Sequence, residues 1–209
     1  MRLKNQGAMA LQRIAGLAAV ALCLANPAFA QDAGTSAAAK GAAVAKALDN
    51  AMTPGAAQKL LEPMIGSFDV RILTWVDPSK PPLESTASAV SVWVLGNRYV
   101  QTMLVGDPSN DAFSGIGYIG YDNVAKVHQA AWMDNGSTAI TLYTGGFAAD
   151  GKSATMKART DNPVSGKPSP VELRMSLGAN GSHVTQLWGQ GLGTKVFKMM
   201  ELQYTRTKP

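Results

Sequence analysis

The stretch SGIGYIGYDN, residues 114–123, decides between two folds for this chain. Its three glycines have the spacing GxGxxG, which binds dinucleotides when it follows a buried parallel strand and opens a helix. Here a polar loop, 106–114, precedes the glycines, and the turn dipeptide Asp122-Asn123 and a further strand-like run follow them. The pattern therefore leaves no helix N-terminus to hold a pyrophosphate. We interpret the stretch as one strand of an antiparallel sheet, in which the glycines permit close packing, a bulge or a bend.

The chain after Ser67 repeats this pattern of short strands separated by turns. Apolar and polar residues alternate with period two in runs rich in Val, Ile, Thr, Tyr and Trp, and clusters of Gly, Asn, Asp and Pro separate the runs. The pattern predicts about ten strands, near residues 67–76, 84–95, 98–105, 115–121, 126–133, 138–147, 152–160, 171–178, 182–190 and 194–206. Short antiparallel strands joined by tight turns form an up-and-down meander, and closure into a barrel removes its exposed edges. We therefore predict an all-β fold, an up-and-down antiparallel β-barrel.

Before the strands, the sequence predicts one short helix and a tether. Thr53 suits the N-cap, Pro54 suits the first helical position, and Pro63 ends the helix. We expect this N-terminal helix to cover one end of the barrel. Residues 31–52 are rich in alanine but bury too little apolar surface to fix a helix, so we predict a flexible tether there. Residues 53–207 are predicted to form a single β-barrel domain.

The first 30 residues have the features of a secretory signal peptide. Three basic residues precede an apolar run, 14–24, which ends at the cleavage motif Ala28-Phe29-Ala30. The run is shorter than the roughly 18 residues that a membrane crossing needs, and no later segment is apolar enough to cross. We therefore predict cleavage after Ala30 and a periplasmic or secreted protein with no stable membrane span.

Removal of residues 1–30 changes the cysteine content and the net charge of the remaining chain. The only cysteine, Cys23, leaves with them, so the remainder has no disulfide and no thiolate chemistry. Three of the 19 basic residues and none of the 14 acidic residues lie in this segment, which leaves 16 against 14 and a formal charge of +2. Because no basic cluster remains, we predict no binding to nucleic acid.

The sequence offers few groups for chemistry. Its two histidines, His128 and His183, have no acidic partners at metal-site spacings, so we predict no metal site and no cofactor. His183 follows a turn and is expected to be exposed; an inward-facing haem ligand is the lesser hypothesis. No GxSxG motif occurs. Asp122 and Asp134 fall in turns at opposite ends of the predicted barrel, where each favours an Asx turn rather than a catalytic pair.

Glu201 carries the enzyme hypothesis. It lies among apolar residues of a predicted strand, and an inward-facing carboxylate there needs a partner such as Arg71 or Arg98. An outward-facing, solvated Glu201 is favoured over this arrangement. We therefore predict no catalytic residue and expect a protein that is not an enzyme. A barrel-type hydrolase or isomerase that uses Glu201 with Arg98 is kept as an alternative.

The aromatic residues supply the leading functional hypothesis. The four tryptophans fall in four different predicted strands, and a barrel of this size is either filled by such side chains or holds one small ligand. We predict that Trp93, Tyr118 and Trp132 line a cavity for a small apolar or amphipathic ligand, with Arg98 as a polar anchor. A register shift of one residue would invert these faces. The alternative is a non-enzymatic envelope interaction protein with a filled core.

Successive motifs also resemble those of a bacterial family. They are LLEPMIGSFDV at 60–70, VLGNRYV at 94–100, FSGIGYIGYDN at 113–123, AWMDN at 131–135, TDNPVSGK at 160–167 and FKMMELQYTR at 197–206. In order and spacing they are similar to the family known as domain of unknown function 1579. The resemblance implies a lipocalin-like (calycin-like) barrel and implies no activity. The chain departs from the family pattern at Ser67, where a tryptophan is usual, and at Asn97, where a second glycine is commoner.

Overall fold

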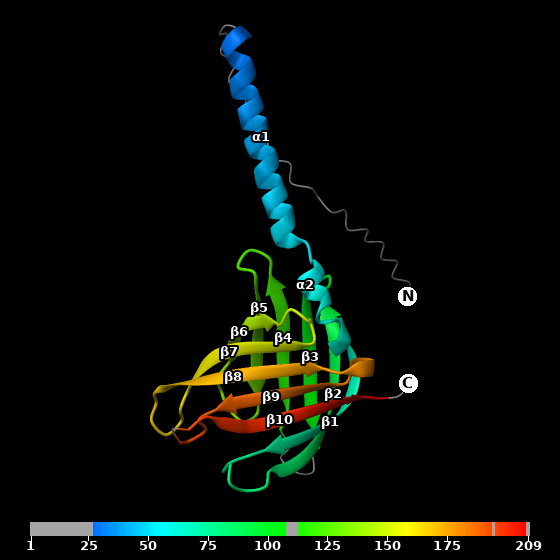
Figure 1. Cartoon of the computed structure of the whole chain (residues 1–209), viewed down its shortest axis with the longest axis vertical. Helices are drawn as coiled ribbons and strands as arrows, with labels where there is room; N and C mark the ends of the chain where they lie inside the picture. Colours follow the sequence, from blue (N-terminus) through cyan, green and yellow to red (C-terminus); the bar gives the residue numbers. More distant parts are fainter. Residues whose placement is uncertain (1–26, 108–112, 194, 208–209) are drawn as a thin grey trace, which may run out of the picture. The chain divides into compact units, whose positions relative to one another are not determined.

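Within residues 27–107, 113–193 and 195–207, which the structure describes, ten antiparallel strands form one closed barrel (Figure 1). This computed structural model confirms the predicted fold class. Each strand pairs with its neighbours in sequence, and β1 closes the barrel by pairing with β10. The strands are β1 (Gly66–Thr74), β2 (Leu83–Val94), β3 (Tyr99–Gly106), β4 (Gly115–Asp122), β5 (Val127–Asp134), β6 (Thr141–Phe147), β7 (Ser153–Asp161), β8 (Pro168–Leu177), β9 (His183–Gly189) and β10 (Phe197–Arg206).

Tight turns join most of the strands, and their residues explain the register. Leu95, Gly96 and Asn97, between β2 and β3, all have positive φ, which glycine and asparagine adopt at least cost. The observed strands lie close to the predicted ranges. The starts differ by three residues at β6, which begins at Thr141 and not at residue 138, and at β8, which begins at Pro168 and not at residue 171. The predicted start of the last strand, residue 194, lies outside the described residues.

The alanine-rich segment predicted to be a flexible tether is helical. The α-helix α1 spans Pro27–Met52, and its side chains from residue 36 to residue 52 are exposed. The high helix propensity of alanine, rather than burial, accounts for it. Contacts divide the described residues into two units, one up to Ala45 and one from Lys46 onward. Most of the predicted signal peptide, residues 1–26, lies outside the described residues. None of the described helices combines the length and the apolar character that a membrane crossing requires.

Pro54 ends α1 rather than starting the next helix, which corrects the predicted helix start. The N–H of Thr53 donates to the carbonyl oxygen of Asp49 at 2.9 Å, and Pro54 has no N–H with which to continue the helix. The short helix α2 (Ala56–Lys59) starts after Gly55, whose N–H donates to Gln58 Oε1 at 2.7 Å. The predicted N-terminal helix therefore exists but is a single turn.

The segment formed by α2 and the 3-10 helix η1 (Glu62–Met64) closes one end of the barrel, as expected (Figure 1). Leu61 and Met64 are buried in one core cluster with Val100 of β3 and Ile119 of β4. Burial of these apolar side chains fixes the segment across the strand ends. We call this end the capped end.

Hydrogen bonds reinforce the capped end. Gln58 is buried, and its Nε2 donates to the carbonyl oxygen of Tyr121 at 3.2 Å. Arg206, the last residue of β10, donates from its guanidinium to the carbonyl oxygens of Pro63 at 3.2 Å and Ile65 at 2.8 Å. Charge-assisted hydrogen bonds of this kind satisfy carbonyl groups that the short helical turn leaves without partners.

Candidate ligand cavity

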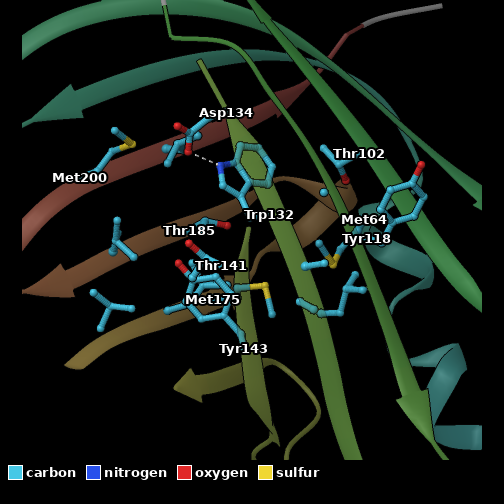
Figure 2. A pocket seen from close by; sticks show the side chains of 18 of the residues that line it. Met64, Thr102, Tyr118, Trp132, Asp134, Thr141, Tyr143, Met175, Thr185 and Met200 are labelled. Atoms are coloured by element: carbon cyan, nitrogen blue, oxygen red, sulfur yellow. Dashed lines mark hydrogen bonds between the residues drawn. The ribbon is translucent and has the colours of Figure 1, made fainter. Parts of the chain in front are cut away.

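Strand register places alternate residues of each strand inside the barrel. Gly117 of β4 pairs with Trp132 of β5, which pairs with Thr141 of β6. Successive residues of a strand point to opposite faces, so these positions and every second residue from them face inward. They enclose a cavity of about 270 Å³ (Figure 2). Its wall is largely apolar and includes Trp132, Tyr143, Met175, Met199, Met200 and Leu202.

The cavity extends from the capped end of the barrel toward the opposite end. Met64, His183 and Tyr204 line it at the capped end, and all three are buried. Asp134 and Thr141 line it where β5 ends and β6 begins, at the opposite end, and both are half-buried. The greater exposure of the second group indicates that the cavity opens at that end.

The glycines of β4 make room for the indole ring of Trp132. A Cβ atom on Gly117 would lie 2.6 Å from Cε3 of Trp132, and a Cβ atom on Gly115 would also overlap the ring. Only glycine at these positions therefore lets the indole lie across β4. Gly120 gives the ring of Tyr99 the same space. The GxGxxG spacing thus serves close packing between strands, one of the roles that the sequence predicts.

Trp132 is held near the open end by a hydrogen bond and a ring contact. Its Nε1–H donates to Asp134 Oδ2 at 2.8 Å, and the ring of Phe113 stacks on the indole with centroids 6.2 Å apart. Asp134 Oδ1 accepts from the N–H of Gly136 at 2.9 Å, which is the predicted Asx turn. Asp134 is the only Asp, Glu, Lys or Arg among the described residues that line the cavity.

His183 is buried at the capped end, so the expectation of an exposed imidazole is wrong. It is the first residue of β9 and takes an inward position of the ladder, opposite Tyr204 of β10. Only 4% of it is exposed, and its ring stacks on that of Tyr204 with centroids 4.1 Å apart. Burial lowers the pKa of His183 to about 4, so the imidazole is neutral near pH 7.

The two nitrogens of His183 have different roles. Nδ1 lies 3.2 Å from the carbonyl oxygen of Gly181. Because a carbonyl oxygen only accepts, Nδ1 carries the proton and Nε2 keeps a free lone pair. No hydrogen bond to Nε2 occurs among the described residues, and His183 lines the cavity. The cavity therefore has one neutral nitrogen acceptor at its capped end.

Two tyrosine hydroxyl groups also lack partners within the described part of the chain. Tyr143 of β6 and Tyr204 of β10 are buried and line the cavity. Burial raises the pKa of Tyr143 to about 12 and also raises the pKa of Tyr204, so both hydroxyls stay protonated and can donate. Thr102 differs, because its hydroxyl bonds with that of Ser91 at 2.8 Å. The cavity thus combines an apolar wall with unpartnered hydrogen-bonding groups.

Two of the four predicted site residues border the cavity. Trp132 points into the cavity. Tyr118 also borders the cavity, but it occupies an outer-face position of β4, where its hydroxyl accepts from Gln101 Nε2 at 2.8 Å. Trp93 faces inward by register but lies outside the lining, and its Nε1–H donates to Glu62 Oε2 at 2.8 Å. The sequence identifies the aromatic residues but not the strand register, which decides whether each side chain points into the barrel or outward.

Arg98, the predicted polar anchor, lies outside the cavity lining. Its guanidinium donates to the carbonyl oxygens of Leu95 at 3.2 Å, Gly96 at 3.4 Å and Met52 at 2.7 Å. It therefore stabilises the turn between β2 and β3. The structure does not bring Arg98 to Trp132 or to Glu201.

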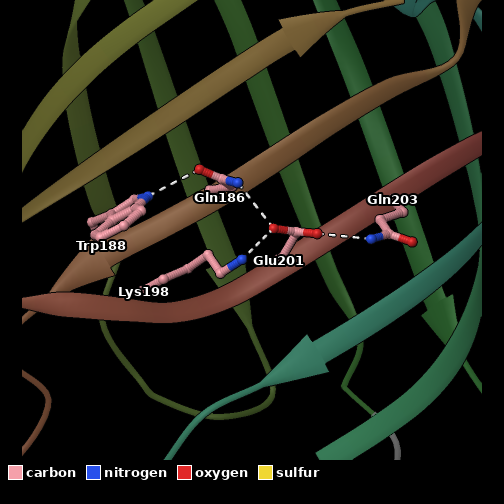
Figure 3. Close-up of polar contacts among 5 residues, drawn as sticks. All are labelled: Gln186, Trp188, Lys198, Glu201 and Gln203. Carbon is pink, nitrogen blue, oxygen red and sulfur yellow. Dashed lines mark hydrogen bonds and ion pairs between the residues drawn. The ribbon is translucent and has the colours of Figure 1, made fainter. Parts of the chain in front are cut away.

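Glu201 faces outward and lies in a polar cluster on the outer wall, away from the cavity (Figure 3). Its Oε2 accepts from Lys198 Nζ at 2.6 Å and from Gln186 Nε2 at 2.9 Å, and its Oε1 accepts from Gln203 Nε2 at 2.7 Å. Burial by itself would raise the pKa of Glu201, but these hydrogen bonds outweigh it and hold the pKa below its usual value. We call these four residues the Glu201 cluster.

His183, Tyr143 and Tyr204 line the cavity although the sequence did not predict them as cavity residues. The only signal for them was alternation: Tyr204 is two residues after Leu202, and Tyr143 is two residues after Thr141. His183 meets the one condition of the haem hypothesis, an inward-facing imidazole. Within the described residues, no three His, Cys, Asp or Glu side chains gather closely enough to hold a metal ion.

Comparison with known proteins places the chain in a family. The model of the family described as "Protein of unknown function (DUF1579)" matches residues 53–206, and the chain belongs to this family, as its motifs indicate. A search of curated proteins gives no match. Among solved structures, the chain is similar to the crystal structure of Rv2717c from M. tuberculosis, with a TM-score of 0.53 and 14% identity over 75% of this chain and 100% of that one. At this identity the likeness shows the barrel fold alone.

Proposed function

We propose that this member of the DUF1579 family binds a small apolar or amphipathic molecule inside its barrel. The observation that carries the proposal is the cavity of about 270 Å³, closed at one end and lined mainly by aromatic and aliphatic side chains. Ligand sites in proteins are typically concave and apolar, with a few polar groups that fix orientation. The unpartnered groups of His183, Tyr143 and Tyr204 match that description.

Methionines add to the support. Met64, Met175, Met199 and Met200 line the cavity from η1, β8 and β10. Their unbranched, polarisable side chains adapt to ligands of different shape. A filled core, which the alternative hypothesis requires, would need side chains that pack this space to the density of a protein interior.

The enzyme alternative has little support from the site. Glu201 is turned away from the cavity, and its oxygens accept hydrogen bonds from Lys198, Gln186 and Gln203. Arg98, its proposed partner, is bound to main-chain oxygens of another turn. A carboxylate in this setting is stabilised as an anion, and it does not line the cavity, which lies on the other face of the wall.

Calorimetric titration of the purified protein with two uncharged probes, decan-1-ol and 1-methylnaphthalene, tests the proposal. We expect saturable binding of at least one probe at one site per chain. The variant Gly117→Ala should weaken this binding at least fivefold, because the new methyl group would push the indole of Trp132 out of its place in the wall.

Gly146→Ala is the matched control. Gly146 also lies in a strand, β6, but a Cβ atom there meets its nearest neighbour at an ordinary 3.9 Å. This variant should bind both probes as the wild type does. Absence of saturable binding of both probes to the wild-type protein would overturn the proposal.

Export is the second part of the proposal. The basic residues, apolar run and Ala28-Phe29-Ala30 motif of the N-terminus support a cleaved signal peptide and a periplasmic or secreted location. N-terminal sequencing of the protein recovered from the periplasm of its host is the test. A first residue of Gln31 is expected, and an intact Met1 in a cytoplasmic fraction would contradict it.

A second candidate function, self-association, is favoured by the outer face of β2 to β6. Outward positions there carry seven exposed apolar side chains: Val90, Val92, Tyr99, Met103, Val105, Tyr118 and Leu142. At exposures of 36% to 67% they present on the order of 600 Å² of apolar surface, close to the roughly 800 Å² that each partner buries in a stable complex. Among the described residues, the outward positions between these seven side chains carry no charge, so two copies could pair there without repulsion.

Sedimentation analysis tests this second function. A dimer is expected for the wild-type protein at micromolar concentration, and Met103→Lys should convert it to a monomer with an unchanged melting temperature. Thr155→Lys, on the exposed outer face of β7, is the control and should remain dimeric. A wild-type protein that is monomeric at all concentrations would contradict self-association.

A further inference from the structure

We propose that the cavity selects uncharged amphiphiles with a hydroxyl group, which His183 and Tyr204 hold at the capped end, and that it excludes carboxylates. The inference rests on the proposed function, because it names the chemical class of the ligand for the same cavity. The inference follows from two features of the described lining: the hydrogen-bonding groups that face the cavity, and the lack of Lys and Arg side chains there.

His183 supplies the acceptor for such a hydroxyl group. Its Nδ1 proton is directed to the carbonyl oxygen of Gly181, so the lone pair of Nε2 has no partner among the described residues. Every fully buried side-chain nitrogen and oxygen of the described residues has a hydrogen-bond partner, so Nε2, which has none, keeps accessible surface on a ring that lines the cavity. A ligand O–H that donates to Nε2 would satisfy it, whereas a carboxylate or an ether has no proton to donate.

Tyr204 supplies the donor. Its ring stacks against that of His183 at the same end of the cavity, and its hydroxyl has no partner in the described part of the chain. Because it remains protonated, the hydroxyl donates to a ligand oxygen. A hydroxyl group is both donor and acceptor, so one ligand atom can satisfy the neighbouring groups of His183 and Tyr204.

The charges around the cavity oppose an anionic ligand. The described lining has no Lys or Arg, and its one carboxylate, Asp134, lies at the open end. Arg206 lies close enough to His183 to help lower the pKa of its imidazole, but the guanidinium of Arg206 is bound to the carbonyl oxygens of Pro63, Ile65 and Asn180. A carboxylate inside the cavity would therefore be buried without a cationic partner, which is strongly unfavourable.

The rest of the cavity suits an apolar chain or ring. Met175, Leu202 and Met200 contribute apolar side chains to the same wall as Trp132. A ligand whose hydroxyl is bound at His183 would place its apolar part along these side chains and reach the open end beside the indole.

Matched ten-carbon probes separate the two ligand classes. Decan-1-ol and decanoate differ only in the head group, and calorimetric titration of the full chain at pH 7 compares them. We expect decan-1-ol to bind at least tenfold more tightly. Because only the neutral acid can enter, the apparent affinity for decanoate should rise as the pH falls from 7 to 5.5, while that for decan-1-ol stays constant.

Tyr204→Phe removes the donor and keeps the ring. Loss of one neutral hydrogen bond should weaken decan-1-ol binding by about fivefold and leave 1-methylnaphthalene, which has no hydroxyl, unaffected. Tyr99→Phe removes a hydroxyl from the outer wall and is the matched control, with unchanged affinity for both probes. The melting temperature of each variant shows whether it folds.

A measurement on the wild-type protein does not depend on any variant. The two histidines have opposite tautomers, since Nε2 of His128 is the nitrogen that lies 3.2 Å from a carbonyl oxygen, that of Ala57. Their nitrogen-15 spectra therefore distinguish them. Addition of decan-1-ol should shift the Nε2 resonance of His183 upfield, as expected when a free acceptor receives a hydrogen bond, and leave His128 in place.

The outcomes of these experiments distinguish failure of the inference from failure of the proposed binding function. Decanoate that binds as tightly as decan-1-ol, or an unchanged Nε2 resonance of His183 at saturation, overturns the inference while the binding function stands. If 1-methylnaphthalene and both ten-carbon probes fail to bind, both the inference and the proposed function fail.

Discussion

The two faces of β9 and β10 handle polar groups in opposite ways. On the inner face, His183 and Tyr204 stack on each other and leave hydrogen-bonding atoms without partners. On the outer face of the same strands, Gln186, Lys198 and Gln203 together direct three hydrogen bonds to Glu201. Burial is similar, at 4% exposed for His183 and 9% for Glu201. The difference between the faces therefore lies in the partners.

This contrast shows where a ligand is needed. Every fully buried side-chain nitrogen and oxygen of the described residues has a hydrogen-bond partner, whereas the inner groups without a partner belong to residues that line the cavity, where a ligand can reach them. The Glu201 cluster is complete within the chain, so nothing further has to bind there. The inner groups are incomplete, and a ligand in the cavity would complete them. Changes confined to one face should therefore affect different measurements.

The largest expected effect comes from acid, on the inner face. Burial depresses the pKa of His183 to about 4, below its usual 6.5, so the unfolded chain binds a proton more readily than the folded protein. The stability contributed by the neutral imidazole is thus complete above pH 6.5 and is lost as the pH falls toward 4. We expect a loss of about 3 kcal/mol over this window.

His183→Phe isolates this effect from other groups that titrate. Phenylalanine can keep the ring stack on Tyr204 but has no proton to gain. Urea unfolding at several pH values should therefore show a flatter profile between pH 6.5 and 4 for the variant. Parallel profiles for the two proteins would show that His183 is not the buried base described here.

The next largest effect is expected on the outer face, from Lys198→Met. This change removes the cation from the buried carboxylate of Glu201 and also from the face of the indole of Trp75, whose centroid lies 4.5 Å from Lys198 Nζ. An unpaired, partly buried carboxylate should cost about 2 kcal/mol, as measured by urea unfolding at pH 7. Binding of decan-1-ol should not change, because Lys198 does not line the cavity. A weaker affinity would mean that the two faces are coupled.

The same two faces show what the sequence can and cannot predict. Period-two alternation and turn residues such as Asn97 and Gly181 predict ten strands and their closure into a barrel, because they depend on local chemistry. Which face of a strand points inward depends on the register of pairing between distant strands. Trp132 lines the cavity, and His183, which was expected to be exposed because a turn precedes it, is turned inward by the ladder opposite Tyr204.

Glu201 shows a second limit of the same kind. Its expected partners were Arg71 and Arg98, whereas Arg71 pairs with Glu84 across β1 and β2, and Lys198 pairs with Glu201 across the irregularity in β10. The ladder shift between Lys198 and Met200 decides this partnership. A bulge of this kind has no clear sequence signal, since it depends on how the neighbouring strand pairs.

A smaller effect is expected when one hydrogen-bonding side chain is replaced on each face. Gln203→Met removes a donor from Glu201 and should cost about 1 kcal/mol. Thr185→Val removes an inner hydroxyl for which no hydrogen-bond partner occurs in the described residues, and it should leave the stability unchanged or slightly raise it. Thermal unfolding at pH 7 compares the two variants. Equal losses of stability would contradict the idea that only the outer network is complete.

Among the changes on the outer face, the smallest effect is expected from Glu201→Gln. The amide keeps the size of the side chain and still accepts hydrogen bonds, while Lys198, which is 28% exposed, can turn toward water. The loss of stability at pH 7 should be about 0.5 kcal/mol, as for a partly exposed ion pair. Because the wild-type pKa lies below its usual value, this difference should vanish as the pH falls through the folded pKa and the carboxylate is protonated. Decan-1-ol affinity should equal that of the wild type. A selective loss of binding, with folding intact, would instead place Glu201 in the functional site and revive the enzyme alternative.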